Sequence, residues 1–240
     1  MLELRNICFD VYEDGVKKSI LKNVNLKIDQ RFVALTGPNG GGKSTLAKVI
    51  AGIVKPTSGQ IFLDGEDITN LSITDRAKKG ISFAFQQPVR FKGITVKDLI
   101  SMAKGSDISV SEACKYLSEV GLCAKDYINR EVNASLSGGE LKRIEIATVM
   151  ARSTKLSIFD EPEAGIDLWS FNNLIKVFEN MHEKIGGSII IISHQEKILD
   201  IADTVVVIAD GSVRKSGSKE EILPELLGAA SVCKALEDKL

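Results

Sequence analysis

The sequence predicts an α/β fold in which a mostly parallel sheet carries helices on its faces and a helical insertion interrupts the middle of the chain. Three observations predict it. Strand-length apolar runs alternate with helical patterns over residues 156–208, as in parallel sheets with crossover helices. From about Val96 to Arg152 the apolar spacing is helical, with few β-branched runs. A glycine-rich turn at residues 37–42 joins an apolar strand to a helix.

The individual elements follow from apolar runs and their spacing. In chain order, strands are expected over residues 2–9, 19–28, 31–35, 59–63, 81–85, 156–159, 188–192 and 204–208. Helices are expected over residues 43–51, within 96–152, over 170–184 and 196–201, and in the tail after Pro224. A charged connector precedes the strand at 81–85.

Length and composition bound the class of protein. A chain of 240 residues can bury a substantial core as one large domain or two joined lobes. The net charge of −1 offers no general attraction to nucleic acid or to an anionic membrane. The longest apolar runs are too short to span a bilayer. The N-terminal residues 1–5 carry early charges and no apolar core, so no signal peptide is expected.

The cysteines give no sign of a metal site or of disulfides. Cys8, Cys114, Cys123 and Cys233 are scattered, with no CxxC pair. Structural burial is therefore the expected role. Together with the missing targeting segment, this usage favours the cytoplasm.

The first candidate phosphate site is the segment from Gly37 to Ser44, which matches GxxxxGK[ST] between a strand and a helix. Glycines let backbone N–H groups surround a phosphate, and the helix directs its positive end at the anion. Lys43 is expected to reach the β- and γ-phosphates of a nucleotide, and Ser44 to supply a hydroxyl to Mg²⁺.

Polar residues at strand ends supply candidate groups for hydrolysis. Asp160 and Glu161 end the strand at 156–159. Asp160 is expected to hold Mg²⁺ through water, and Glu161 to polarise the attacking water. Gln86 and His194 follow two other strands, and the carboxyl ends of parallel strands converge on the ligand crevice.

The segment Leu136-Ser137-Gly138-Gly139-Glu140 predicts a second anion site. Ser137 with Glu140 three positions later forms the pattern of a capping box that opens a helix. The two glycines allow a ligand to approach the bare amides of that helix closely.

Together these residues resemble the ABC-type ATPases over essentially the whole chain. The segment 37–44 matches the Walker A motif of the family, Gln86 the Q-loop, 136–140 the signature, 156–161 the Walker B strand, 164–167 the D-loop and His194 the switch histidine. The resemblance implies a P-loop NTPase fold: a mostly parallel RecA-like core sheet, an N-terminal antiparallel β subdomain and an inserted α-helical subdomain. It implies one ABC ATPase domain over 1–240, with a nucleotide-binding core at 1–87 and 151–240 and a helical subdomain at 88–150.

The resemblance also assigns the site residues for hydrolysis of ATP with Mg²⁺. The catalytic residues would be Glu161, His194 and Gln86. The nucleotide-binding residues would be Gly37, Pro38, Asn39, Gly40, Gly41, Gly42, Lys43, Ser44, Thr45, Ser137, Gly138, Gly139 and Asp167. The Mg²⁺ ligands would be Ser44, Gln86 and Asp160. Two copies would face head to tail, each ATP lying between Lys43 of one copy and the signature of the other. Nucleic acid is not an expected partner.

Two positions depart from the family pattern. The family stacks adenine on an aromatic residue some way before the Walker lysine, and the matching position here is near Val11, with Tyr12 beside it and Phe9 close. The signature ends in Glu140 where Gln is usual. Either side chain completes a capping box, so this change implies no altered chemistry.

The segment 137–146 is similar to the SufC branch of the family, which has SGGE, a basic pair and then Glu-Ile, and 84–89 resembles that branch's Q-loop. The favoured interpretation is therefore a divergent SufC-like ATPase that drives iron–sulfur cluster assembly with a SufB- or SufD-like scaffold. Glu161-Pro162-Glu163-Ala164 and His194-Gln195-Glu196 depart from the branch.

The alternative is the cytoplasmic nucleotide-binding subunit of a membrane transporter, peripheral to the membrane. In that case the segment from Gln86 to about Leu99 would receive a coupling helix from a transmembrane permease subunit. A DNA-repair ATPase of the same family is disfavoured, because such proteins place long coiled coils between phosphate loop and signature, and only residues 45–136 separate the two here.

Overall fold

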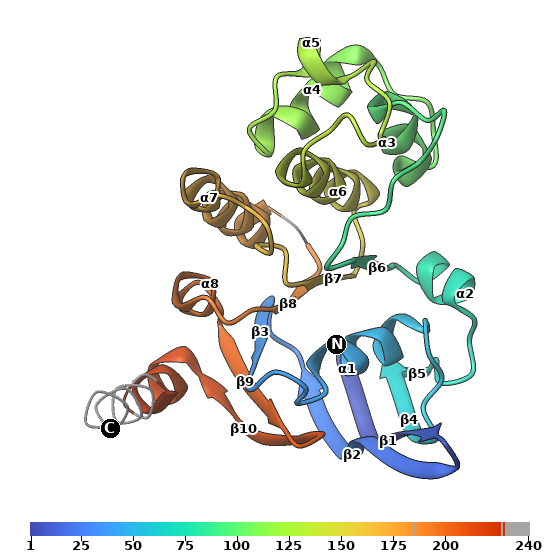
Figure 1. Cartoon of the computed structure of the whole chain (residues 1–240), viewed down its shortest axis with the longest axis vertical. Coiled ribbons are helices and arrows are strands. Elements are labelled where there is room, and N and C mark those ends of the chain that lie inside the picture. Colours follow the sequence, from blue (N-terminus) through green and yellow to red (C-terminus); the bar gives the residue numbers. More distant parts are fainter. Residues whose placement is uncertain (185, 227, 229–240) are drawn as a thin grey trace. The chain divides into compact units, whose positions relative to one another are not determined.

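The structure is a computed structural model, and it describes residues 1–184, 186–226 and 228. The chain divides into two compact units, one formed by Met1–Leu71 with Ile192–Leu240 and the other by Ser72–Ile191. Figure 1 labels the elements of both. Among the described residues, no helix has both the length and the apolar character needed to cross a bilayer.

The first unit contains most of the strands. Its elements are β1 (Leu2–Glu13), β2 (Val16–Ile28), β3 (Phe32–Thr36), α1 (Lys43–Ala51), β4 (Ser58–Leu63), β5 (Glu66–Asp67), α8 (Glu196–Asp200), β9 (Thr204–Ala209) and β10 (Ser212–Ser218). Strands β2, β1, β4 and β5 form an antiparallel sheet in that order. Beside it runs the order β10-β9-β3, in which β3 and β9 are parallel and β10 is antiparallel. All five residues of β3 are buried, as expected for a strand with both faces covered.

The second unit contains most of the helices. Its elements are α2 (Ile73–Lys78), β6 (Ile81–Ala84), α3 (Val96–Lys104), α4 (Val110–Glu119), α5 (Ala124–Tyr127), α6 (Gly138–Arg152), β7 (Leu156–Asp160), α7 (Leu168–Lys184) and β8 (Ser188–Ile192). Strands β8, β7 and β6 are neighbours in that order, and β6 and β7 are parallel. Helices α3 and α4 pack against α6, and Figure 1 shows this group of helices together.

The predicted α/β fold is confirmed, and the apolar runs from which strands and helices were predicted lie on strands and helices of the structure. Some features were not predicted. The residues Asp14 and Gly15 both have positive φ, as the two-residue turn of a hairpin requires, so β1 and β2 continue beyond the predicted runs. The charged connector contains α2, whose N-cap Ser72 accepts from the Asp75 N–H. The tail after Pro224 lies largely outside the described residues, and the predicted division at residues 88–150 stays a prediction.

Candidate functional site

The predicted phosphate loop lies in the first unit, between β3 and α1. Gly37 has a φ of 128° and Gly42 a φ of 104°, a backbone region that disfavours any residue with a Cβ. A Cβ on Gly41 would lie 2.8 Å from the carbonyl oxygen of Ile208. The loop therefore lies directly against β9, and only glycine allows this close approach.

Lys43 is the first residue of α1, and its side chain is buried. The ammonium donates to the carbonyl oxygens of Gly37 at 2.7 Å and Pro38 at 2.9 Å. These bonds hold the positive charge within the loop. The N-cap of α1 is Gly42, which has no side chain to cap the first amides of the helix. The positive end of α1 and the lysine therefore lie together, as the predicted phosphate site requires.

His194 also belongs to the first unit and lies in the exposed segment after β8. The residue before it, Ser193, is fully buried. Its N–H donates to the Leu35 carbonyl at 3.2 Å, and its Oγ accepts from the Gln195 N–H at 3.0 Å. The buried serine therefore fixes the direction in which the chain leaves β8 and presents His194.

The predicted hydrolytic residues of the second unit meet at the end of β7. All five residues of β7 are buried, and Asp160 is its last residue. Glu161 follows with a φ of 47°, a left-handed conformation that is uncommon for a residue other than glycine. Such strain concentrates at functional sites. Gln86 Nε2 donates to Glu161 Oε2 at 2.5 Å, so the structure brings Gln86 and Glu161 together.

Lys142 is a buried cation that sequence reasoning did not place in the site. Its Nζ donates to the Phe85 carbonyl at 2.7 Å. Burial lowers its pKa, and the nearby carboxylates of Glu145, Glu163, Asp160 and Glu161 oppose this effect. Lys142 and Glu145 are three residues apart and share one face of α6, but no pattern in the sequence shows that this face meets Phe85.

The predicted capping box at the start of α6 is confirmed. The Oγ of Ser137 accepts from the Glu140 N–H at 3.2 Å, and Glu140 Oε2 accepts from the Ser137 N–H at 2.6 Å. Apart from the adjacent residues and the backbone of α6 itself, no described atom lies within 4 Å of a Cβ placed on Gly138 or Gly139. Neither glycine has the positive φ that would require glycine. Packing within the chain therefore does not account for them, whereas a ligand close to the helix start would.

Glu140 uses its second oxygen on another residue. The Tyr127 hydroxyl donates to Glu140 Oε1 at 2.5 Å, and Arg130 lies 3.7 Å from the same oxygen. The hydrogen bond from Tyr127 is the main reason why the pKa of Glu140 is below its usual value. Glu140 thus joins the start of α6 to α5 as well as completing the cap.

Asp167 lies immediately before α7 and is exposed. Its Oδ1 accepts from the Ser170 N–H at 3.0 Å, and the Ser170 hydroxyl accepts from Arg143 at 2.5 Å. The first turn of α7 is therefore joined to α6. Of the candidate adenine-stacking residues, Tyr12 on β1 is 73% exposed, and Phe9 and Val11 are half-buried.

Known proteins that are similar to this chain indicate its family. Residues 21–164 match the family described as ABC transporter. An uncharacterised ABC transporter ATP-binding protein of Methanocaldococcus jannaschii is 41% identical over 214 residues, covering 85% of this chain and 85% of that protein. The spermidine/putrescine import ATP-binding protein PotA of Mesoplasma florum is 34% identical over 232 residues, covering 94% of this chain and 63% of that protein.

One solved structure has a similar fold. A dimeric ATP-binding cassette in a post-hydrolysis state, bound to ADP and phosphate, matches with a TM-score of 0.82 and 24% identity. The match covers 91% of this chain and 99% of that one, and it confirms the predicted fold. The relatives named above are ATP-binding proteins of transporters. Their names give no support to the predicted branch that assembles iron–sulfur clusters.

Proposed function

We propose, from the premise that this chain belongs to the ABC transporter family of ATPases, that it is the ATP-binding subunit of a membrane transporter. The observation that carries the proposal is the match to transporter ATP-binding proteins over most of the chain. The chain itself supplies no described helix that could cross a membrane. In this proposal a membrane subunit supplies the transport path, and this chain lies at its cytoplasmic face.

The phosphate loop would bind the triphosphate of ATP. The backbone N–H groups of 37–42 and the positive end of α1 favour an anion. The Lys43 ammonium, held by the carbonyls of Gly37 and Pro38, adds a full positive charge. Ser44 and Thr45 follow in the first turn of α1, and Tyr12, exposed on β1, is our candidate for adenine stacking.

The donor set fits Mg²⁺. The proposed ligands Ser44, Gln86 and Asp160 all present oxygen atoms, which is the ligand type that Mg²⁺ prefers. Asp160 is buried at the end of β7, where its carboxylate is positioned by the strand rather than by solvent. When bound with ATP, the ion would neutralise charge on the phosphates.

Glu161 would activate the water that attacks the γ-phosphate. The left-handed backbone at this residue and the hydrogen bond from Gln86 hold its carboxylate in one orientation, which a group that positions water requires. His194, directed by the buried Ser193, would contact the phosphate from the first unit. The helical segment 88–150 would then act as the subdomain that presents the signature.

A second copy of the chain would complete the ATP site. The open space over Gly138 and Gly139 leaves the first amides of α6 free to approach a phosphate of the neighbouring copy. Ser137 and Asp167 lie at the starts of α6 and α7 and would contact the same nucleotide. Binding of ATP would close the dimer, and hydrolysis would open it again. This cycle would move the membrane subunit.

Affinity purification of the tagged chain from native membranes and from the soluble fraction tests the assignment. We expect an integral membrane protein to copurify from detergent extracts, and ATP turnover to depend on Glu161. Recovery of a soluble SufB- or SufD-like scaffold in its place would refute the transporter assignment and restore the role in cluster assembly.

A further inference from the structure

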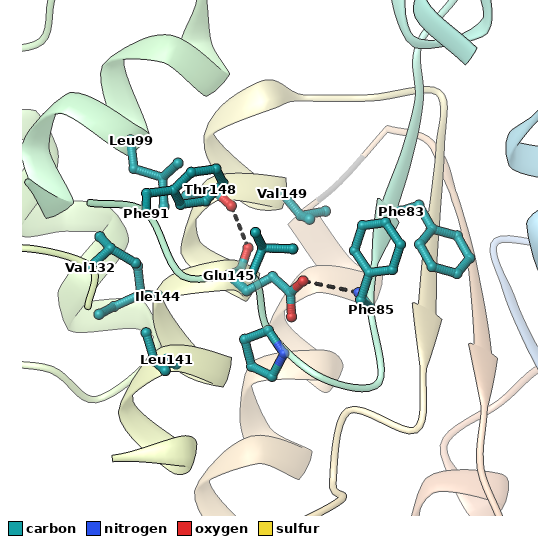
Figure 2. A pocket seen from close by; sticks show the side chains of 12 residues that line it. Phe83, Phe85, Phe91, Leu99, Val132, Leu141, Ile144, Glu145, Thr148 and Val149 are labelled. Atoms are coloured by element: carbon teal, nitrogen blue, oxygen red, sulfur yellow. Dashed lines mark hydrogen bonds between the residues drawn. The ribbon is translucent and has the colours of Figure 1, made fainter. Parts of the chain in front are cut away.

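A small pocket of about 180 Å³ lies within the second unit. Its wall combines residues from the end of β6 and the following segment with residues from α3 and α6. Aromatic and aliphatic side chains dominate it, among them Phe85, Val89, Phe91, Leu99, Leu141 and Ile144. Figure 2 labels five of these side chains, Phe85, Phe91, Leu99, Leu141 and Ile144, together with Glu145. Among the described lining residues, Glu145 is the only one with an ionisable side chain.

Only one of the two Glu145 carboxylate oxygens accepts a hydrogen bond within the described part of the chain. One oxygen, Oε1, accepts from the backbone N–H of Phe85 at 2.9 Å, the bond drawn in Figure 2. The other oxygen, Oε2, is buried and has no hydrogen-bond partner among the residues that the structure describes. A buried acceptor without a donor is costly, so a donor from outside the chain would be strongly favoured here.

Lys142 is the cation that faces Glu145, and it does not remove this need. Its ammonium is bound to the Phe85 carbonyl, and its charge is shared with Asp160, Glu161 and Glu163. Burial accordingly outweighs both Lys142 and the Phe85 N–H, and raises the pKa of Glu145 to about 7.

The size of the pocket indicates what kind of donor it accepts. Sites for small-molecule ligands usually measure about 300–1,000 Å³, so this pocket suits one or two side chains of a docked protein segment. Phe85 and Val89 are 36% and 46% exposed and offer apolar surface to such a segment. Arg90 and Lys92 are exposed beside them. Their positive charges would disfavour a segment with a run of basic residues more strongly than a segment with a single basic residue.

We propose that this pocket selects the membrane subunit by accepting one lysine or arginine side chain, flanked by apolar residues, whose cationic group pairs with Glu145. The inference rests on the proposed function, because the segment is taken to belong to the membrane subunit. The apolar neighbours of the basic residue would cover Phe85 and Val89. A segment with only apolar residues would fill the pocket but leave Glu145 Oε2 without a donor.

Three synthetic peptides test the charge preference. Each is an amphipathic helix with an apolar stripe of leucines, and the central position of the stripe is lysine, norleucine or glutamate. Binding to the full chain is measured by fluorescence anisotropy. We expect the lysine peptide to bind at least about tenfold more tightly than the norleucine peptide, because it pairs with a desolvated carboxylate. The glutamate peptide should bind weakest of the three.

Two variants assign the preference to Glu145. In Glu145→Gln, the difference between the lysine and norleucine peptides should disappear. In Glu145→Leu, which makes the pocket wholly apolar, the norleucine peptide should bind more tightly than the lysine peptide. Asp126→Asn changes the same charge at an exposed site of α5 and should keep the wild-type preference.

Equal binding of the lysine and norleucine peptides to the wild-type chain would overturn the inference, as would no binding of any peptide. A lysine preference that survives in Glu145→Gln would also overturn it. Failure of the proposed function is seen separately, when the wild-type chain neither hydrolyses ATP nor copurifies with a membrane protein.

Discussion

The side-chain amide of Gln86 donates a 2.5 Å hydrogen bond to Oε2 of Glu161. The preceding residue, Phe85, has both of its backbone groups bound by α6, its N–H by Glu145 and its carbonyl by Lys142. Phe85, which lines the pocket, is therefore the direct chain neighbour of the residue that contacts the proposed catalytic carboxylate. This contact offers a route for coupling between the pocket and Glu161, and a change in turnover on partner binding would demonstrate such coupling.

Glu161→Gln should abolish ATP turnover while leaving ATP binding intact. The amide has nearly the shape of the carboxylate but cannot accept a proton from water, and loss of a general base typically costs about 10²–10⁴-fold in rate. Phosphate release measures turnover, and size-exclusion chromatography with ATP should show a dimer that does not dissociate. Hydrolysis at the wild-type rate would remove Glu161 from the mechanism.

Lys43→Ala should weaken nucleotide binding itself. The change removes a positive charge that the loop holds in place through Gly37 and Pro38, and charge-assisted contacts to phosphate are among the stronger polar interactions. Titration with a fluorescent ATP analogue should show at least about a tenfold rise in Kd, the equivalent of 1.4 kcal/mol. An unchanged affinity would contradict the phosphate-loop assignment.

Gly138→Val should weaken the ATP-dependent dimer while leaving the stability of the fold almost unchanged. The side chain enters open space, so the free energy of unfolding should change by no more than about 1 kcal/mol. ATP should still bind to the monomer, but the new side chain would obstruct the approach of a second copy's nucleotide. Gly138→Val is introduced into the Glu161→Gln variant, and analytical ultracentrifugation in the presence of ATP measures the dimer. A dimer of normal affinity would exclude the signature from the interface.

Glu145→Gln should change the dependence of stability on pH. The folded pKa of Glu145 is about 7, above the usual 4.5, so the folded chain binds the proton more tightly than the unfolded chain. Its contribution to stability is therefore lost as the pH rises from 4.5 to 7, by up to about 3 kcal/mol. Glutamine stays neutral throughout this range.

Urea midpoints of both proteins near pH 5, close to the lower end of that range, and near pH 8, about one unit above its upper end, provide the measurement. The wild type should lose stability relative to Glu145→Gln on going to the higher pH. A constant difference between the two proteins would show that Glu145 has an ordinary pKa.

Much of the fold was predictable because the apolar runs are local signals. The strand at 156–160 and the loop at 37–42 are each defined by consecutive residues, so their positions follow from the sequence alone. The cap formed by Ser137 and Glu140 is equally local. The short α2 and the turn at Asp14 and Gly15 carry few apolar residues, and periodicity could not find them.

The interactions of α6 were not predictable, since they depend on what packs against it. Tyr127 is far enough from Glu140 in the chain that no pattern joins them, and the same holds for Phe85 and Lys142. The interpretation of Glu140 as a sign of the cluster-assembly branch likewise did not take account of the residues that pack against α6. The bonds of Glu140 to Ser137 and Tyr127 give this residue a structural explanation that says nothing about the partner.

The left-handed backbone at Glu161 has a consequence for protein engineering. Asparagine adopts this conformation at lower cost than glutamate, so Glu161→Asn would relieve local strain while removing the group proposed to activate water. A library screened only for thermal tolerance would therefore enrich inactive chains at this position. Heat resistance and turnover oppose each other at residue 161, and a stabilised form of the enzyme must be selected with ATP hydrolysis as a second criterion.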